Sequence, residues 1–149
     1  MTAAGITLPA GYPPAGLYEK SVLVSDILYV GGHGPVSDGE RINGKVGPGG
    51  PVSLDDARRA ARLTGLQILS SVREALGSLD RVERVVKVLG MVNCAPGFNQ
   101  TPAVIDGCSE LFHEIFGEAG RHTRSAVGMA ELPFDIPVEI EAIFQVKPA

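Results

Sequence analysis

The apolar residues of this chain follow two different spacings along its length. Between residues 54 and 76, and again between 102 and 116, they recur every three or four positions, which predicts two amphipathic helices. Short β-branched or alternating runs predict five strands, over residues 21–24, 27–32, 82–92, 125–130 and 138–146. Gly and Pro gather in residues 1–16, which predict an extended arm, and in the polar stretch of residues 35–51, which predicts a long loop.

The predicted elements follow the order β-β-α-β-α-β-β, in one domain over residues 1–149. Two helices on one face of a mixed sheet, an α+β architecture, bury the apolar stripe of each helix and leave the other face of the sheet uncovered. Ser53 before the first helix and Gly77 after it are typical capping residues. Thr101 is expected to cap the second helix, with Pro102 at its first position.

The uncovered face of the sheet is expected to carry an unusual mixture of side chains. In the last strand, Val138 and alternate residues after it should face the helices, so Glu139 and Glu141 face the other way. The alternation of the preceding strand groups Arg124 with Ala126 on this open face. Small and apolar residues beside two carboxylates and an arginine are typical of an assembly surface with polar groups at its edge.

Residues 132–137 are expected to join the last two strands as an ordinary hairpin. Glu139 would then lie across from about Ala130, and Arg124 about six residues further along. At about 3.3 Å per residue, the two side chains would be roughly 20 Å apart. Within one chain they would be too far apart to bind the same small molecule, and only neighbouring subunits could bring them to one site.

Composition and charge favour a small protein with neither a nucleic-acid nor a membrane partner. The formal net charge is -4 and no basic cluster offers phosphate contacts, so nucleic-acid binding is not expected. No apolar run approaches the ~20 residues of a membrane span and no secretory signal pattern opens the chain, which predicts a cytoplasmic protein. Cys94 and Cys108 are expected to stay reduced. Because His33, His113 and His122 share no ligand spacing, no metal is expected.

Three features allow both a structural and a chemical interpretation. The run Gly31-Gly32-His33-Gly34 follows a strand. It is either a tight strand exit or a pocket of backbone N–H groups beside an imidazole. Arg124 and Glu139 are either solvated strand residues or the charged groups of a site, and the residues alone leave both interpretations open.

Motifs in three parts of the chain match one known family. The most specific is C-terminal, with Arg124-Ser125-Ala126-Val127, Glu131-Leu132-Pro133 and residues 138–143. The supporting ones are Pro14-Ala15-Gly16-Leu17-Tyr18, residues 29–35, and residues 85–93 with Phe98. Together they cover nearly the whole chain and resemble the RidA/YjgF family of reactive-intermediate (enamine/imine) deaminases, formerly called L-PSP endoribonucleases.

The resemblance implies a chorismate-mutase-like domain that forms a homotrimer, with ligand sites in clefts between subunits. It also implies hydrolysis of 2-imino acids, released as enamines by pyridoxal-phosphate enzymes, to 2-keto acids and ammonia without a cofactor. Arg124 matches the position that binds the substrate carboxylate, and Glu139 matches the acidic position that activates water. Tyr18 and Gly32 match an aromatic hydroxyl and a backbone donor of the cleft.

Several positions depart from the family pattern. The strand-exit loop commonly reads Ser-Gly-Gln, whereas His33 here puts a group that titrates near pH 6.5 beside the cleft. Ala126 stands where many relatives carry Cys, Asp106 stands at a common Asn, and residues 44–51 are inserted. Two other functions therefore stay open. One is a trimeric small-carboxylate binding protein without turnover, and the other, less favoured by the negative charge, is an endoribonuclease or translation inhibitor.

Overall fold

The computed structural model describes residue 2, residues 4–37 and residues 41–149. Residues 1 and 3 of the expected arm and residues 38–40 of the expected loop lie outside this part of the chain. The strands are β1 (Ser21–Val24), β2 (Ile27–His33), β3 (Val82–Asn93), β4 (Thr123–Met129) and β5 (Val138–Val146). The helices are α1 (Leu54–Leu76) and α2 (Thr101–Phe116), with three short 3-10 turns, η1 (Leu79–Arg81), η2 (Gly117–Gly120) and η3 (Pro133–Asp135). The predicted order of elements is confirmed.

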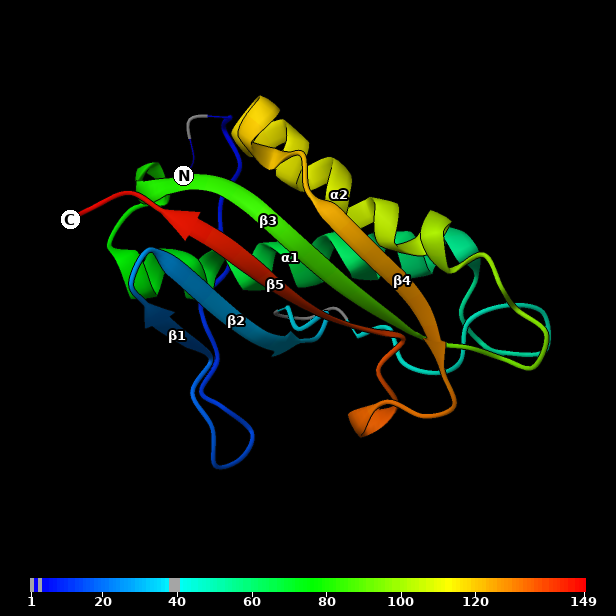
Figure 1. Cartoon of the computed structure of the whole chain (residues 1–149). Coiled ribbons are helices and arrows are strands. Elements are labelled where there is room, and N and C mark those ends of the chain that lie inside the picture. The colour runs from blue at the N-terminus through cyan, green and yellow to red at the C-terminus, as the bar shows by residue number, and fades with distance from the viewer. Residues whose placement is uncertain (1, 3, 38–40) are drawn as a thin grey trace.

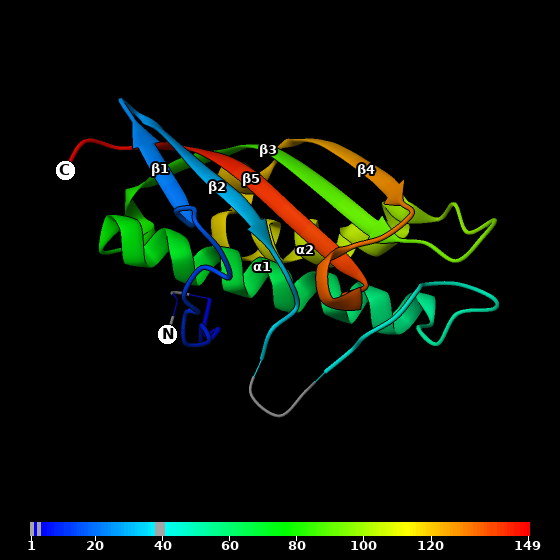
Figure 2. The same ribbon diagram turned by 90° about the horizontal axis from the view of Figure 1, so that it is seen from below.

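One five-stranded sheet forms in the order β1-β2-β5-β3-β4. β3 and β4 run parallel and the other pairs are antiparallel, so the sheet is mixed, as predicted. Both helices lie on one side of this sheet, and its other face is open (Figure 2). β1 lies at one edge of the sheet and β4, beside α2, at the other (Figure 1).

The expected hairpin between the last two strands is wrong, because β3 lies between β4 and β5. Asn93, the buried last residue of β3, explains the path of the connection. Its side-chain amide donates hydrogen bonds to Asp135 Oδ1 at 3.1 Å and to the Ile136 carbonyl at 3.2 Å. Its backbone N–H donates to the Pro137 carbonyl at 2.8 Å. These bonds carry the chain across the end of β3 before it enters the sheet as β5.

The alternation predicted for β5 is confirmed. Its first residue and every second residue after it are buried against the helices: Val138, Ile140, Ala142, Phe144 and Val146. Glu139 and Glu141 consequently emerge on the open face. On that face, the register brings Tyr29 of β2 opposite Ile143 of β5.

The two helices begin differently. Ser53 caps α1 as predicted, since its side chain accepts a hydrogen bond from the Asp56 N–H at 3.1 Å. Thr101 does not cap α2. It is the first residue of the helix, and its hydroxyl donates to the Ala126 carbonyl of β4 at 3.0 Å. The predicted cap is therefore a tether between α2 and the edge strand.

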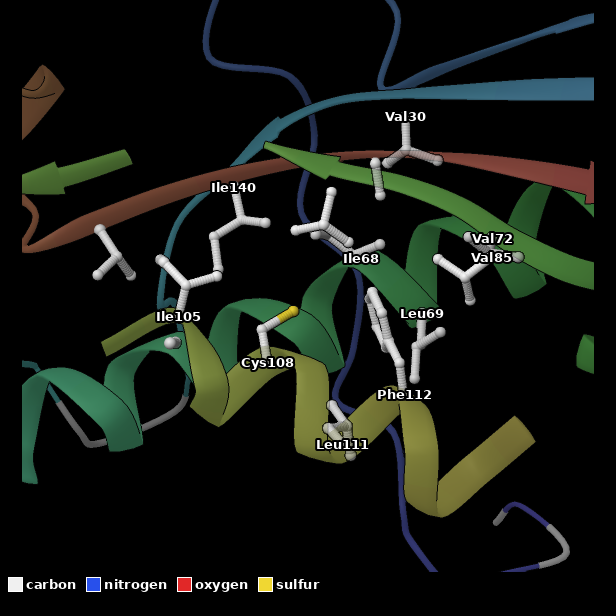
Figure 3. Packing of buried hydrophobic residues seen from close by; sticks show 14 of the residues in the cluster. Val30, Ile68, Leu69, Val72, Val85, Ile105, Cys108, Leu111, Phe112 and Ile140 are labelled. Carbon is white, nitrogen blue, oxygen red and sulfur yellow. The ribbon is translucent and has the colours of Figure 1, made fainter. Parts of the chain in front are cut away.

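The core lies between the sheet and the helices, and small residues let the layers approach closely. A Cβ at Gly65 of α1 would lie 2.9 Å from Leu111 Cδ2 of α2, so glycine is needed where the helices meet. Phe112 of α2 packs edge-on against Phe144 of β5, with ring centroids 5.9 Å apart. Figure 3 shows Phe112 and Cys108 pointing from α2 into this cluster. Burial raises the pKa of the Cys108 thiol to about 12, which keeps it protonated as a core residue.

Candidate functional site

A cavity of about 550 Å³ opens where β2 ends. Its walls come from the N-terminal arm, the end of β2, the middle of α1, η3 and the start of β5. Four residues singled out from the sequence line it: Tyr18, Gly32, His33 and Glu139. They lie far apart along the chain, and the pairing of β2 with β5 brings them together.

Glu139 reaches from the open face of the sheet over Gly32. A Cβ at position 32 would lie 2.3 Å from Glu139 Oε2, so a larger residue would displace this carboxylate from its position. Partial burial raises the pKa of Glu139, and the nearby negative charge of Glu141 raises it further. Within the described part of the chain, no group donates a hydrogen bond to Glu139 that would offset these effects. The carboxylate is therefore suited to accept a proton from a bound molecule.

His33 is turned toward the helices on the inner side of the cavity. Its Nδ1 lies 2.7 Å from the Gly31 carbonyl, and its Nε2 lies 2.7 Å from Ser71 Oγ of α1. Burial lowers the pKa of the imidazole, the bond to Gly31 partly offsets this, and the positive charge of Lys20 lowers it again. His33 is therefore held neutral near pH 7.

The sequence did not identify several residues of the cavity. Gln67 and Ser71 are buried polar residues one turn apart on α1, and Gln67 Nε2 donates to the Val36 carbonyl at 2.6 Å. In the sequence, the signal that could have identified them is two polar residues four positions apart on an otherwise apolar helix face. Lys20 also lines the cavity and forms an ion pair with Glu74 at 2.6 Å. Phe134 of η3, with φ 57°, gave no signal in the sequence.

The other three predicted residues, Asp106, Arg124 and Ala126, do not line the cavity. Arg124 lies at the β4 edge and turns toward α2. Its Nη1 donates to Asp106 Oδ1 at 2.7 Å and to Ser109 Oγ at 3.1 Å, and its Nη2 donates to the Pro102 carbonyl at 3.3 Å. Ala126, two residues along the same strand, accepts the hydrogen bond from Thr101.

Arg124 and Glu139 thus occupy different faces of one sheet. The expectation that Arg124 lies on the open face is wrong, since its guanidinium contacts the helix that covers the opposite face. Arg124 pairs with Val88 of β3, whereas Glu139 pairs with Met91 of the same strand. β3 lies between the strands that carry Arg124 and Glu139, and the two side chains emerge on opposite faces of the sheet.

Two further properties concern metals and membranes. Over residues 4–37 and 41–149, together with residue 2, no three His, Cys, Asp or Glu side chains gather as metal ligands would. In the same residues, no helix has both the length and the apolar character to cross a membrane.

The order of elements and the mixed five-stranded sheet with two helices on one face match the YjgF/chorismate-mutase-like fold. A sequence model described as "YjgF/chorismate_mutase-like, putative endoribonuclease" matches residues 1–138, so the chain belongs to this family. The predicted resemblance to RidA/YjgF proteins is confirmed.

Individual relatives agree with this assignment. The chain is 41% identical over 145 residues to protein TCP17 of Trypanosoma cruzi, which covers 96% of this chain and 89% of that protein. It is 32% identical over 142 residues to a 2-iminobutanoate/2-iminopropanoate deaminase of Dermatophagoides farinae, covering 95% of each. The crystal structure of Atu1372 from Agrobacterium tumefaciens, a protein of unknown function, has a TM-score of 0.87 and 41% identity, covering 96% of this chain and 87% of that one.

Proposed function

We propose that this protein hydrolyses 2-imino acids to 2-keto acids and ammonia, in clefts completed by a neighbouring subunit of a homotrimer. The observation that carries the proposal is the meeting of Tyr18, Gly32 and Glu139 around one cavity. These are the positions for which the family resemblance implies an aromatic hydroxyl, a backbone donor and a water-activating acid. The similarity to a 2-iminobutanoate/2-iminopropanoate deaminase supports the same reaction.

A substrate carboxylate needs a positively charged partner. The lysine that lines the cavity of one chain, Lys20, is already in an ion pair, with Glu74 at 2.6 Å. Arg124 can grip both carboxylate oxygens at once, yet it lies across the sheet on the other face. A cleft that receives Arg124 from a second subunit would hold both charges of the reaction.

The open face of the sheet supports such an assembly. Val22, Tyr29 and Val127 lie on it and expose 50%, 49% and 39% of their area. An apolar surface of this kind, which also carries Glu139 and Glu141 of β5, favours burial against another copy of the chain.

The reaction needs one proton acceptor and one water molecule. Glu139 accepts a proton from water while the oxygen attacks the imine carbon, and the imine nitrogen takes up a proton from solvent. Glu139 then passes its proton to the amino nitrogen of the resulting carbinolamine. The C–N bond breaks and ammonia leaves as the C=O bond forms and the hydroxyl proton passes to Glu139, which returns it to solvent. Arg124 holds the carboxylate throughout, so the imine carbon stays beside the water.

The direct test is to follow 2-iminopropionate generated freshly from alanine by an amino-acid oxidase. We expect the imine to disappear, and pyruvate and ammonia to appear, faster with the protein than in buffer. Decay at the buffer rate, at protein concentrations that still bind pyruvate, would reject the deaminase.

The shared cleft is tested by mixing two inactive variants. Arg124→Ala and Glu139→Ala chains, unfolded and refolded together, should form some clefts with both residues intact and recover partial activity. Each variant refolded alone is the control. Mixed trimers that remain inactive would show that the two residues do not meet between subunits.

One observation favours the second candidate, a carboxylate-binding protein without turnover. Asp106 neutralises Arg124 at 2.7 Å, in place of the amide common in the family. A bound carboxylate must then compete with Asp106 for the guanidinium. Pyruvate binding measured by calorimetry, without acceleration of imine decay, would identify this function.

A further inference from the structure

The structure contains two serine–histidine pairs with the same arrangement of hydrogen-bond contacts. In each, the Nδ1 of a histidine contacts the carbonyl two residues earlier, and the Nε2 contacts a serine hydroxyl on a helix. His33 contacts Gly31 O and Ser71 Oγ, both at 2.7 Å. His122 contacts Gly120 O at 2.6 Å and Ser109 Oγ at 2.9 Å.

The surroundings of the two serines differ. Ser109 also accepts a hydrogen bond from Arg124 Nη1 at 3.1 Å, which occupies its oxygen. Ser71 is buried in α1, with 3% of its area exposed, and it is one of the residues that line the 550 Å³ cavity. The first pair therefore combines a serine on the wall of this cavity with a histidine at hydrogen-bond distance, whereas Ser109 does not line it.

The hydrogen bonds also fix the direction of proton transfer at His33. A carbonyl oxygen only accepts, so the bond to Gly31 places the ring proton on Nδ1. In the neutral ring Nε2 is then an acceptor, and the Ser71 hydroxyl donates to it. A nucleophile, a base beside it and a third group that orients the base form the arrangement found in serine hydrolases.

We propose that Ser71 is a nucleophile activated by His33, which makes the cavity an acyl-transfer site for short-chain esters. Ser71 Oγ attacks the ester carbonyl carbon as its proton passes to His33 Nε2. The C–O bond to the alcohol breaks, and the alcohol leaves with this proton. Water then hydrolyses the acyl-serine with His33 again as the base, releasing the carboxylic acid and restoring the hydroxyl.

The charged groups that face His33 set the conditions for this chemistry. Burial lowers the pKa of the imidazole most, and the positive charge of Lys20, which lines the same cavity, lowers it further and favours the neutral ring. Glu139 also lines the cavity, on the open-face side. Because the base form of His33 persists below the usual titration range of imidazole, the reaction should extend to lower pH than a solvent-exposed serine–histidine pair would allow.

A fluorophosphonate tests the nucleophile, since an activated serine displaces its fluoride and forms a stable phosphonyl ester. We expect one adduct on the folded, unsubstituted protein, located at Ser71 by peptide mass spectrometry. Ser71→Ala should lose the adduct, and His33→Gln should form it about 100-fold more slowly. Ser109→Ala is the matched control and should label at the original rate.

Two results would overturn the proposal: no adduct at Ser71 in the unsubstituted protein, or an equal loss of labelling in Ser109→Ala. The hydrolysis of p-nitrophenyl acetate by the same proteins gives the rate for a short-chain ester. Neither measurement uses an imine. Failure here would therefore leave imine hydrolysis intact, and failure of imine hydrolysis would leave the serine chemistry intact.

Discussion

The cavity at the end of β2 contains the Glu139 carboxylate, and the β4 edge carries the Arg124 guanidinium. The two groups differ in how far neighbouring residues stabilise their charge. In the cavity, Glu139 is partly buried, its pKa is raised, and no described residue donates a hydrogen bond to it. At the β4 edge, Arg124 donates to Asp106, Ser109 and the Pro102 carbonyl. The Glu139 carboxylate thus receives no hydrogen bond from the described residues, whereas the Arg124 guanidinium is held by an ion pair and two further hydrogen bonds.

This difference indicates which region performs chemistry within one chain. An under-compensated carboxylate in a cavity is typical of a catalytic group, whereas a saturated ion pair between a strand and a helix is typical of a structural one. Arg124 gains a role in substrate binding only if assembly carries its cluster to another chain's cavity. Each region can therefore be changed separately, and the two sets of variants should behave differently.

Among the conservative substitutions, the largest effect is expected from Glu139→Gln, which keeps the shape of the side chain and removes its basicity. We expect imine hydrolysis to fall by about 100-fold or more, as for loss of a general base. The matched control is Glu141→Gln, the neighbouring carboxylate on the same face, which should retain activity at neutral pH. Comparable losses in both variants would mean that the negative charge of the face matters, and not Glu139 itself.

Arg124→Lys should have the next largest effect. A lysine keeps the charge but cannot form paired hydrogen bonds with a carboxylate, so we expect KM to rise by about tenfold or more. Arg124→Ala should abolish the reaction. Circular dichroism and melting must accompany both, because Arg124 also links β4 to α2. Normal KM in a folded Arg124→Lys protein would assign Arg124 to structure alone.

The sequence predicted the fold well because the fold depends on local periodicity. The alternation in β5 and the cap at Ser53 follow from neighbouring residues, and both are confirmed. The hairpin failed because strand order depends on distant contacts. Asn93 and Asp135 are 42 residues apart, and nothing in the pattern of either segment predicts that they bond.

The site was predictable in part for the same reason. Family resemblance identified Glu139 and Gly32, which the structure places in contact. Ser71 was missed because a buried serine within a helix has no local signature, and its role depends on His33, 38 residues earlier. The side-chain direction of Arg124 was predicted wrongly. Alternation divides the residues of a strand into two sets that face opposite ways, but at a sheet edge it does not show which set faces the helices.

Asp106→Asn removes the carboxylate that neutralises Arg124 at the β4 edge, and so tests whether this guanidinium can bind a ligand. The amide keeps the size of the side chain and loses its charge, which leaves the Arg124 guanidinium available to a substrate carboxylate. We expect a several-fold lower KM for imino acids and tighter pyruvate binding by calorimetry. Glu110→Gln, which removes the separate ion pair with Arg58, is the control and should change neither. Unchanged affinity in Asp106→Asn would show that Arg124 does not meet the ligand.

The acid limb of the pH–rate profile should move in a defined direction in Glu141→Gln. Glu139 acts as a base, so activity falls as pH decreases through its raised pKa. Removing the negative charge of Glu141 lowers that pKa, and the acid limb should shift to lower pH. The measurement is kcat/KM across the acid range in a single mixed buffer of constant ionic strength. A shift to higher pH would exclude Glu139 as the titrating group.

The smallest effect concerns stability, where His33 and His122 can be compared directly. Burial lowers the pKa of both, so the folded protein keeps each ring neutral while the unfolded chain takes up protons below about pH 6.5. The free energy of unfolding therefore decreases as pH falls through this range.

In His33→Gln this contribution disappears, and the drop in Tm between pH 7.5 and 5.5 should be smaller than in the unsubstituted protein. The change should be a few degrees, since 1 kcal/mol shifts Tm by roughly 2–4 °C for chains of this size. Lys20, whose positive charge contributes to the lowered pKa of His33, and Glu139 line the same cavity and are present in both proteins. His122→Gln should show the same sign, because its ring is held by the same kind of hydrogen bonds. An undiminished pH dependence in His33→Gln would show that the folded protein binds a proton at this ring, and would remove the neutral base on which the Ser71 proposal depends.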